Sequence, residues 1–272
     1  MRVSQKGKYY GTQDIKVTFD EIVLSQYDYT VEKTPWHYHE NPYFMFVLHG
    51  NMIDYNKKTK SLLPPGSLMF NNWQEGHYGV RHSKEASGFH LEFEKSWFAK
   101  NDIDLKIFEG SQRVEDPKVH VLFAQLYQEF LMADQYSQIS SELLLTQICA
   151  VLGKEKVAPH QEVPQWVQDL KELVQYDVFR VSLQYLSEQL GVHPVHISRA
   201  VPKYLSSSLG EYIRLVKLKK AIPKLLDSDH SLTQIAYDCG FTDQSHFNRL
   251  FRHYFKISPG QYRKNLGKKY PC

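Results

Sequence analysis

The stretch SLTQIAYDCGFTDQSHFNRLFRHYF, residues 231–255, decides the fold of the C-terminal part of the chain. It begins with a serine suited to cap a helix and then runs for about two helical turns. It next reaches a glycine, the residue that most readily adopts the left-handed conformation that ends a helix. A second helical stretch follows at once. This order of signals predicts a helix-turn-helix unit at about 231–254.

The same pattern occurs a second time, earlier in the chain. The segment SLQYLSEQLGV, residues 182–192, matches SLTQIAYDCGF, residues 231–241, and the helical stretches that follow the two segments match as well. Such an internal repeat indicates that one structural unit is used twice. The sequence therefore predicts a first helix-turn-helix unit at about 182–204, joined to the second by a helix over 209–226.

The second helix of each unit is expected to expose an arginine. Apolar residues at i, i+3, i+4 and i+7 form its buried stripe, so the opposite faces centre on Arg199 and Arg249. One outward arginine usually only adds solubility, but two in matching register favour reading of the DNA major groove, because a guanidinium bonds guanine O6 and N7 together. These faces predict base contacts from Val195, His196, Ser198, Arg199, Ser245, His246, Asn248 and Arg249, and phosphate contacts from Lys203, Arg252 and Lys256.

Charge is unevenly distributed along the chain. Residues 1–163 carry 17 Lys and Arg against 21 Asp and Glu, a net charge of −4, whereas residues 164–272 carry 16 against 9, a net charge of +7. A basic half joined to an acidic half indicates that the basic half meets a polyanion. Double-stranded DNA is the partner we expect for it.

Composition excludes several other classes of protein. With 42% hydrophobic and 23% charged residues the chain suits a globular protein, and no stretch reaches the roughly 20 apolar residues of a membrane helix. The N-terminus lacks the apolar run of a secretory signal. Three widely spaced cysteines favour free thiols in a reducing compartment over a disulfide framework. We expect a cytoplasmic protein with no membrane partner.

The first hundred residues predict short strands. Alternating runs such as YFMFVL (43–48) and FHLEF (89–93) are separated by turns that contain glycine and proline, a spacing typical of a β-barrel or sandwich. In the second run, one alternating set faces the interior: either His90 with Glu92, or the apolar residues between them.

A helical period replaces the strands from about 116 to 152. Val121 to Leu131 and Leu143 to Val151 carry apolar stripes, which would cover an open end of the barrel or form a self-association surface of a homodimer. Residues 153–163, polar and broken by a proline, predict a linker. The domains are thus expected at 1–152, with the barrel at about 1–100, and at 164–265.

The C-terminal half resembles the AraC-type transcription regulators. The resemblance rests on GFTDQSHFNRLFRHYF (240–255) and SPGQYR (258–263), and it extends from about Trp166 to Arg263. It implies DNA as the partner, with contacts to RNA polymerase as a further expectation of such regulators. By the same resemblance, base contacts fall on Val195, Ser198, Arg199, Gln244, Ser245, Asn248 and Arg249.

The first unit departs from the family pattern at three positions. Pro202 stands where the family usually has a basic residue, and it is expected to kink or end the recognition helix because it has no N–H to donate. Ser206 replaces a common helix-ending glycine. Pro223 is expected to interrupt the connecting helix. The second unit is therefore the safer recognition element.

The N-terminal half is similar to the small cupin-type β-barrel that precedes the DNA-binding domain in many such regulators. His37 and His39 lie two residues apart on one strand and would face the same side, and His77 falls at the histidine of the second cupin motif. Three imidazoles could hold zinc, iron or nickel. Tyr43 or Phe44, however, occupies the usual place of the glutamate ligand.

Three interpretations of these histidines remain open: a metal site, a polar effector pocket formed by His37, His39, Tyr43 and His77, or structural histidines. No cofactor is assigned. The expected fold is α+β, with an N-terminal cupin-like β-barrel and trailing helices, and a C-terminal all-α double helix-turn-helix.

The sequence predicts a sequence-specific DNA-binding transcription regulator, controlled by a small-molecule effector through the helices at 116–152, and not an enzyme. One alternative is a metal-dependent cupin enzyme with an accessory helical domain. The other is a ligand-independent regulator whose barrel only dimerises.

Overall fold

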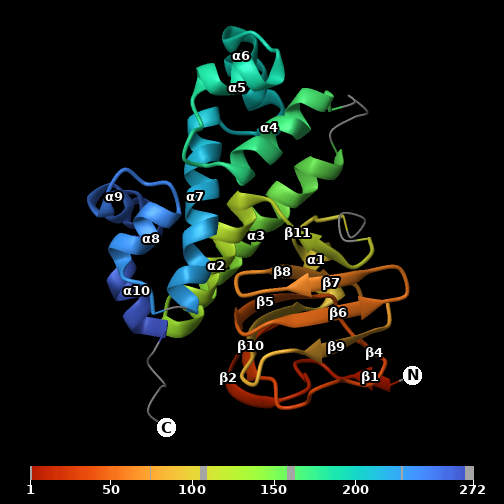
Figure 1. Cartoon of the computed structure of the whole chain (residues 1–272). Helices are drawn as coiled ribbons and strands as arrows, with labels where there is room; N and C mark the ends of the chain where they lie inside the picture. Colours follow the sequence, from red (N-terminus) through yellow and green to blue (C-terminus); the bar gives the residue numbers. More distant parts are fainter. Residues whose placement is uncertain (1, 74, 105–108, 158–162, 228, 267–272) are drawn as a thin grey trace. The chain divides into compact units, whose positions relative to one another are not determined.

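The computed structural model describes residues 2–73, 75–104, 109–157, 163–227 and 229–266 (Figure 1). The chain divides into two compact units, Met1–Lys156 and Val157–Cys272. Within the described ranges, no helix combines the length and apolar character that crossing a bilayer requires.

The first unit contains two β-sheets that enclose an inner cavity. One sheet has the strand order β1 (Arg2–Ser4), β4 (His37–His39), β9 (His77–Arg81), β6 (Met52–Asn56) and β7 (Lys60–Leu63). The other has the order β11 (Gln112–Val114), β8 (Leu68–Asn71), β5 (Tyr43–His49), β10 (Ser87–Phe93), β3 (Ile22–Asp28) and β2 (Thr12–Phe19). The cupin-like architecture is confirmed, but the pairing of the described strands gives two open sheets and not one closed barrel.

Alternation along β10 sends its two sets of side chains to opposite faces of the sheet. Phe89 packs against aromatic residues of α2 (Pro117–Met132), with 5.0 Å between the ring centroids of Phe89 and Phe130. His90 instead contacts tyrosines of the inner cavity, including Tyr29. His90 and Glu92 are therefore the interior set, and α2 covers the outer face of the six-stranded sheet instead of an open barrel end.

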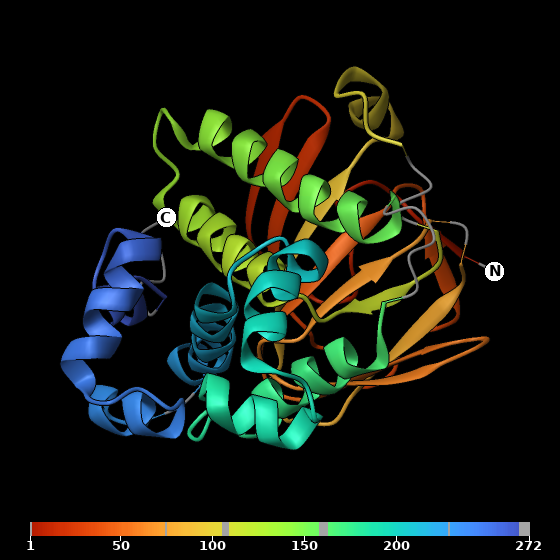
Figure 2. The same ribbon diagram turned by 90° about the horizontal axis from the view of Figure 1, so that it is seen from above.

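Helix α3 (Ser137–Val157) follows α2 and runs back beside it (Figure 2). Leu145, Ile148 and Leu152 are buried, whereas Leu143 is 61% exposed, so the apolar stripe expected through Leu143 does not cover a barrel end; its alternative role as a self-association surface stays a prediction. The helix also continues to Val157, which makes residues 153–157 of the expected linker helical. Lysine and glutamate are good helix formers, and the first proline comes only at position 159. Residues 158–162 of that linker lie outside the described residues. A short helix, α1 (Lys95–Lys100), follows β10.

The second unit is helical throughout its described residues. Its helices are α4 (Gln165–Tyr176), α5 (Leu183–Leu190), α6 (Pro194–Leu205), α7 (Leu209–Leu226), α8 (Leu232–Asp238), α9 (Gln244–Phe255) and α10 (Pro259–Leu266). The core of its first half includes Leu170, Leu186, Ile197, Val201 and Val216. Helix α7 contacts α4 and α6 on one side of the repeat and α8 and α10 on the other, so both copies share it.

Neither proline ends its helix, so the interruption expected at Pro223 is wrong, and of the two outcomes expected at Pro202 the end of the helix is excluded while a kink stays a prediction. Pro202 lies inside α6, which runs on to Leu205, and Pro223 lies inside α7, which runs on to Leu226. A proline removes one backbone hydrogen bond, but tertiary packing keeps both helices in place. Buried Ile222 and Leu225 lie on either side of Pro223, whereas Pro202 follows buried Val201 and precedes the half-buried Leu205. Ser206 takes the left-handed conformation, φ 52°, in place of the usual glycine.

Candidate nucleic-acid interface and inner cavity

The second helix-turn-helix is built by its caps and its turn. The hydroxyl of Ser231 accepts from Gln234 N–H at 3.1 Å, and the carboxylate of Asp243 accepts from His246 N–H at 2.7 Å. Between the two helices Gly240 adopts φ 77°. These local interactions fix α8 and α9 as the sequence predicts.

Helix α9 buries an aromatic face and exposes a polar one. Phe247, Phe251 and Phe255 are buried, whereas Ser245 and Arg249 are exposed. The other expected contacts on this helix divide into the exposed Arg252 and Lys256 and the partly buried Gln244, His246 and Asn248.

Two of the partly buried side chains are already held by neighbours. Gln244 Oε1 accepts from the Thr233 hydroxyl at 2.5 Å, and His246 Nδ1 lies 2.8 Å from Thr242 Oγ1. Burial, together with the nearby charges of Lys217 and Arg249, lowers the pKa of His246. Ser245 and Arg249 are thus the most accessible groups of this face for a base edge.

The first helix-turn-helix repeats this construction. Ser182 caps α5 by accepting from Tyr185 N–H at 3.0 Å, and Gly191 ends it with φ 63°. Ile197 and Val201 of α6 are fully buried. The five residues expected to contact DNA from this helix are all exposed: Val195, His196, Ser198, Arg199 and Lys203.

Side chains of α7 form polar contacts with the second helix-turn-helix. Lys224 Nζ lies 3.0 Å from Asp238 Oδ2, Lys217 Nζ donates to the carbonyl of Gly240, and the Tyr254 hydroxyl donates to Glu211. Lys217 and Lys224 therefore have partners within the helical domain. These contacts help to hold α9 in place relative to α7.

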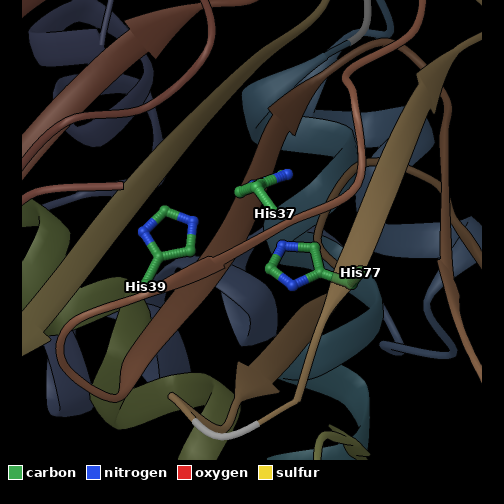
Figure 3. Close-up of side chains that lie close together, drawn as sticks. All are labelled: His37, His39 and His77. Carbon is green, nitrogen blue, oxygen red and sulfur yellow. The ribbon is translucent and has the colours of Figure 1, made fainter. Parts of the chain in front are cut away.

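The inner cavity brings together the four residues that the cupin resemblance implied. His37 and His39 of β4, His77 of β9 and Tyr43 of β5 are buried around a cavity of about 50 Å³. Ligand atoms of the three histidines all lie within 4.8 Å of one another (Figure 3). Tyr43, not Phe44, faces this cavity, because Phe44 packs on the opposite side of the sheet against Phe123.

The hydrogen bonds fix part of the chemistry of these rings. His37 Nδ1 lies 2.8 Å from the Pro35 carbonyl, which can only accept, so Nδ1 carries the proton and Nε2 has a free lone pair. His77 Nε2 lies 3.0 Å from the Tyr43 hydroxyl. Within the described part of the chain, both ring nitrogens of His39 are buried with no hydrogen-bond partner.

Burial keeps these imidazoles neutral. It lowers the pKa of His37 and of His77 to about 4, with the neighbouring His77 adding to the effect at His37, and it holds the pKa of His39 well below its ordinary value. A neutral imidazole with an unpartnered nitrogen is the form that binds a metal ion. The donor set therefore fits a metal held by His37, His39 and His77.

Sequence reasoning did not identify Tyr9, Tyr29 and Asp54 as lining residues, and it left open whether His90 and Glu92 face the interior. Tyr9 stacks on His90 with 3.7 Å between centroids, the Tyr29 hydroxyl lies 3.1 Å from His90 Nε2, and burial raises the pKa of Asp54 to about 7. Glu92 accepts from Gly7 N–H, the Tyr9 hydroxyl and Asn41, which ties residues 7–9 to β10. Only the alternation in FHLEF signalled part of this set.

Comparison with known proteins agrees with the two-part architecture. The family model for an AraC-like ligand-binding domain matches residues 21–149, and that for a helix-turn-helix domain matches residues 186–265. The multiple antibiotic resistance protein MarA of Escherichia coli strain K12 is 33% identical over 98 residues, which cover 36% of this chain and 72% of MarA. The chain belongs to the AraC family.

One further relative of this AraC-family protein and one solved structure give lower identity. The transcriptional activator RhaS of Escherichia coli strain SE11 is 29% identical over 155 residues, and the match spans about half of each chain, 54%. A crystal structure of ToxT from Vibrio cholerae O395 aligns over 92% of this chain and 99% of ToxT, with 13% identity and a TM-score of 0.38.

Proposed function

We propose that this AraC-family protein is a sequence-specific DNA-binding transcription regulator whose N-terminal domain binds a small effector in the inner cavity. The observation that carries the proposal is the repeated placement of Arg199 and Arg249, each exposed on a capped helix that follows a glycine turn. The description of RhaS as a transcriptional activator supports the same interpretation. No enzymatic activity is proposed.

The proposed contacts are those expected from the sequence, of which Gln244, His246 and Asn248 are half-buried and the others exposed. Base contacts are assigned to Val195, His196, Ser198, Arg199, Gln244, Ser245, His246, Asn248 and Arg249, and phosphate contacts to Lys203, Arg252 and Lys256. The effector pocket is assigned to His37, His39, Tyr43 and His77. Contact with RNA polymerase, a homodimer and a cytoplasmic location, where chromosomal DNA lies, complete the proposal.

The decisive experiment measures binding of the full chain to the DNA upstream of its own gene and to a shuffled fragment of the same length. Arg249→Ala should weaken binding to the upstream fragment by roughly 5- to 150-fold, the equivalent of about 1–3 kcal/mol, because one bidentate base contact is lost. Binding to the shuffled fragment should change much less.

Arg180→Ala is the matched control. Arg180 is exposed in the same unit but outside α6 and α9, where it pairs with Asp177. It should leave both affinities unchanged. Equal affinity of the native chain for the two fragments, before and after Arg249→Ala, would defeat the proposal.

A further inference from the structure

Gln244, the first residue of α9, is held by a side chain of the preceding helix. Its Oε1 atom lies 2.5 Å from the hydroxyl oxygen of Thr233 on α8. A separation of 2.5 Å lies in the range of O–H···O hydrogen bonds and is too short for an N–H···O bond. The Thr233 hydroxyl therefore donates to the amide oxygen, and this bond gives the amide group of Gln244 one defined orientation.

The same bond leaves the amide nitrogen of Gln244 available for another partner. Among the described residues, Gln244 Nε2 makes no hydrogen bond, and the atom remains accessible to solvent. An amide NH₂ group carries two donors and no acceptor. Gln244 directly precedes the exposed Ser245 on α9. It therefore offers hydrogen-bond donors to a ligand that approaches this end of the helix.

The first helix-turn-helix has no equivalent pair of side chains. Pro194 occupies in α6 the place that Gln244 occupies in α9, and its ring carries no donor. Gln184 occupies in α5 the place of Thr233, but it donates to Glu188 of its own helix at 3.0 Å. The bond between α8 and α9 therefore gives the second unit an oriented polar group that the first unit lacks.

The orientation of the amide determines which bases it favours. In the major groove guanine presents acceptors at O6 and N7 and thymine presents one at O4, whereas cytosine and adenine present donors at N4 and N6. A glutamine whose amide oxygen and nitrogen are both free favours adenine, because the two atoms pair with N6 and N7 together. Since the oxygen of Gln244 is bonded to Thr233, its nitrogen should favour guanine or thymine.

We propose that Thr233 is a positioning residue for DNA recognition. It holds Gln244 as a hydrogen-bond donor, so that α9 selects guanine or thymine over adenine or cytosine at one position of the DNA site. This inference deepens the proposed function and rests on it, because α9 must lie in the major groove for Gln244 to reach a base. Thr233 itself needs no contact with a base, and it acts through the amide of Gln244.

The test measures the base preference at the position that Gln244 contacts. The full chain is titrated with the upstream fragment and with versions in which each base pair of the bound site is replaced in turn by the other three. The position is the one at which Gln244→Ala removes discrimination between base pairs. There, the two base pairs that the native chain binds best should carry guanine and thymine on the same strand, and they should bind at least about fivefold more tightly than the other two.

Variants assign this preference to the hydroxyl of Thr233, which is exposed and outside the core. Thr233→Val keeps the shape but frees the amide to rotate, so discrimination should fall to within about twofold, with adenine gaining most. Thr233→Ser retains a hydroxyl and should retain the native preference. Gln244→Glu, which can only accept hydrogen bonds when ionised, should reverse the preference. In a Gln244→Ala background, Thr233→Val should leave the base preference unchanged.

Gln184→Ala is the matched control, because Gln184 is the counterpart of Thr233 but bonds within α5. It should leave the preference at the Gln244 position unchanged. Three results would overturn the inference and leave the regulator: a native preference in Thr233→Val, best base pairs that carry purines on one strand, or native discrimination at every position in Gln244→Ala. Equal affinity of the native chain for the upstream and shuffled fragments would instead overturn the proposed function itself.

Discussion

His90 is the least exposed histidine among the described residues of the N-terminal unit. It lies against the ring of Tyr9 and 3.1 Å from the Tyr29 hydroxyl, and burial lowers its pKa to about 3. In the unfolded chain a histidine titrates near pH 6.5. Because the folded pKa is the lower one, the unfolded state binds more protons between these values. With respect to His90, the free energy of unfolding has its full value above about pH 6.5 and decreases as the pH falls towards 3.

Replacing His90 should therefore remove part of the acid sensitivity of folding. From these pKa values, its burial costs about 2 kcal/mol of stability between neutral pH and pH 5. In urea unfolding followed by tryptophan fluorescence, His90→Gln should lose about 2 kcal/mol less than the native chain over that interval. His82→Gln, at an exposed histidine of the same unit, should behave as the native chain, and an unchanged pH dependence in His90→Gln would contradict the assignment.

Only some of the residues that line the cavity could be predicted from the sequence. His37, His39, Tyr43 and His77 were identified through the resemblance to the two cupin motifs, whereas Tyr9 and Asp54 lie on segments that neither motif includes. Whether Tyr43 or Phe44 faced the cavity was also open, because strand alternation gives two sets of side chains but not which set is interior. Tertiary packing against α2 decides it.

The turns that link the helices of each repeat differ in how tightly they are packed. Gly191 and Gly240 both have positive φ, but a Cβ at Gly191 would meet nothing within 4 Å. At Gly240 a Cβ would lie 2.8 Å from Val178 Cγ2 and 3.1 Å from the Val178 carbonyl oxygen. Glycine is therefore required at position 191 only because of its left-handed backbone. At position 240 it is required also because a side chain would collide with Val178.

An alanine scan of the two turns should show this difference. Gly191→Ala should lower the free energy of unfolding by about 1 kcal/mol through the left-handed backbone alone. Gly240→Ala should lose more, by roughly a further 1–3 kcal/mol, since a close contact is added. Urea unfolding of the two full-length variants measures both, and equal losses would show that Val178 moves aside freely.

At the scale of whole helices, the sequence-based predictions were correct where local signals such as capping residues set the ends of a helix. The capping serines and helix-ending glycines placed α5, α8 and both turns correctly. The predicted helix ends at Pro202 and Pro223 are not seen, because tertiary packing overrides the local preference of proline there. Leu143 is exposed, since an apolar pattern does not specify which neighbour, if any, covers a residue.

For the molecule as a whole, the two-part layout follows from its charge and pattern. The net charge of +7 in residues 164–272 against −4 before them agrees with one unit directed at a polyanion and another with a different task. The change from strand to helical periodicity and the internal repeat predicted both folds. The arrangement of the strands as two open sheets and not as a closed barrel was not predictable, because it depends on hydrogen bonds between strands that are distant in sequence.

Electrostatics of the basic unit should appear as a salt dependence of DNA binding. Arg252→Ala should weaken binding to specific and shuffled DNA by similar factors and reduce the slope of log K against log salt by about 1, because one phosphate contact is lost. Anisotropy titrations at several salt concentrations measure the slope. Arg249→Ala, three residues away, should instead affect mainly the specific fragment. A sequence-selective effect of Arg252→Ala would assign it to a base.

One unbroken helix of 18 residues carries both copies of the repeat, with Tyr254, Gly240 and Asp238 fastened to its side chains. Because α7 is about 27 Å long and contacts both helix-turn-helix units, the distance between α6 and α9 can vary little. We therefore expect a single DNA site in which the segments contacted by α6 and α9 have a fixed spacing, and not two half-sites whose spacing can vary.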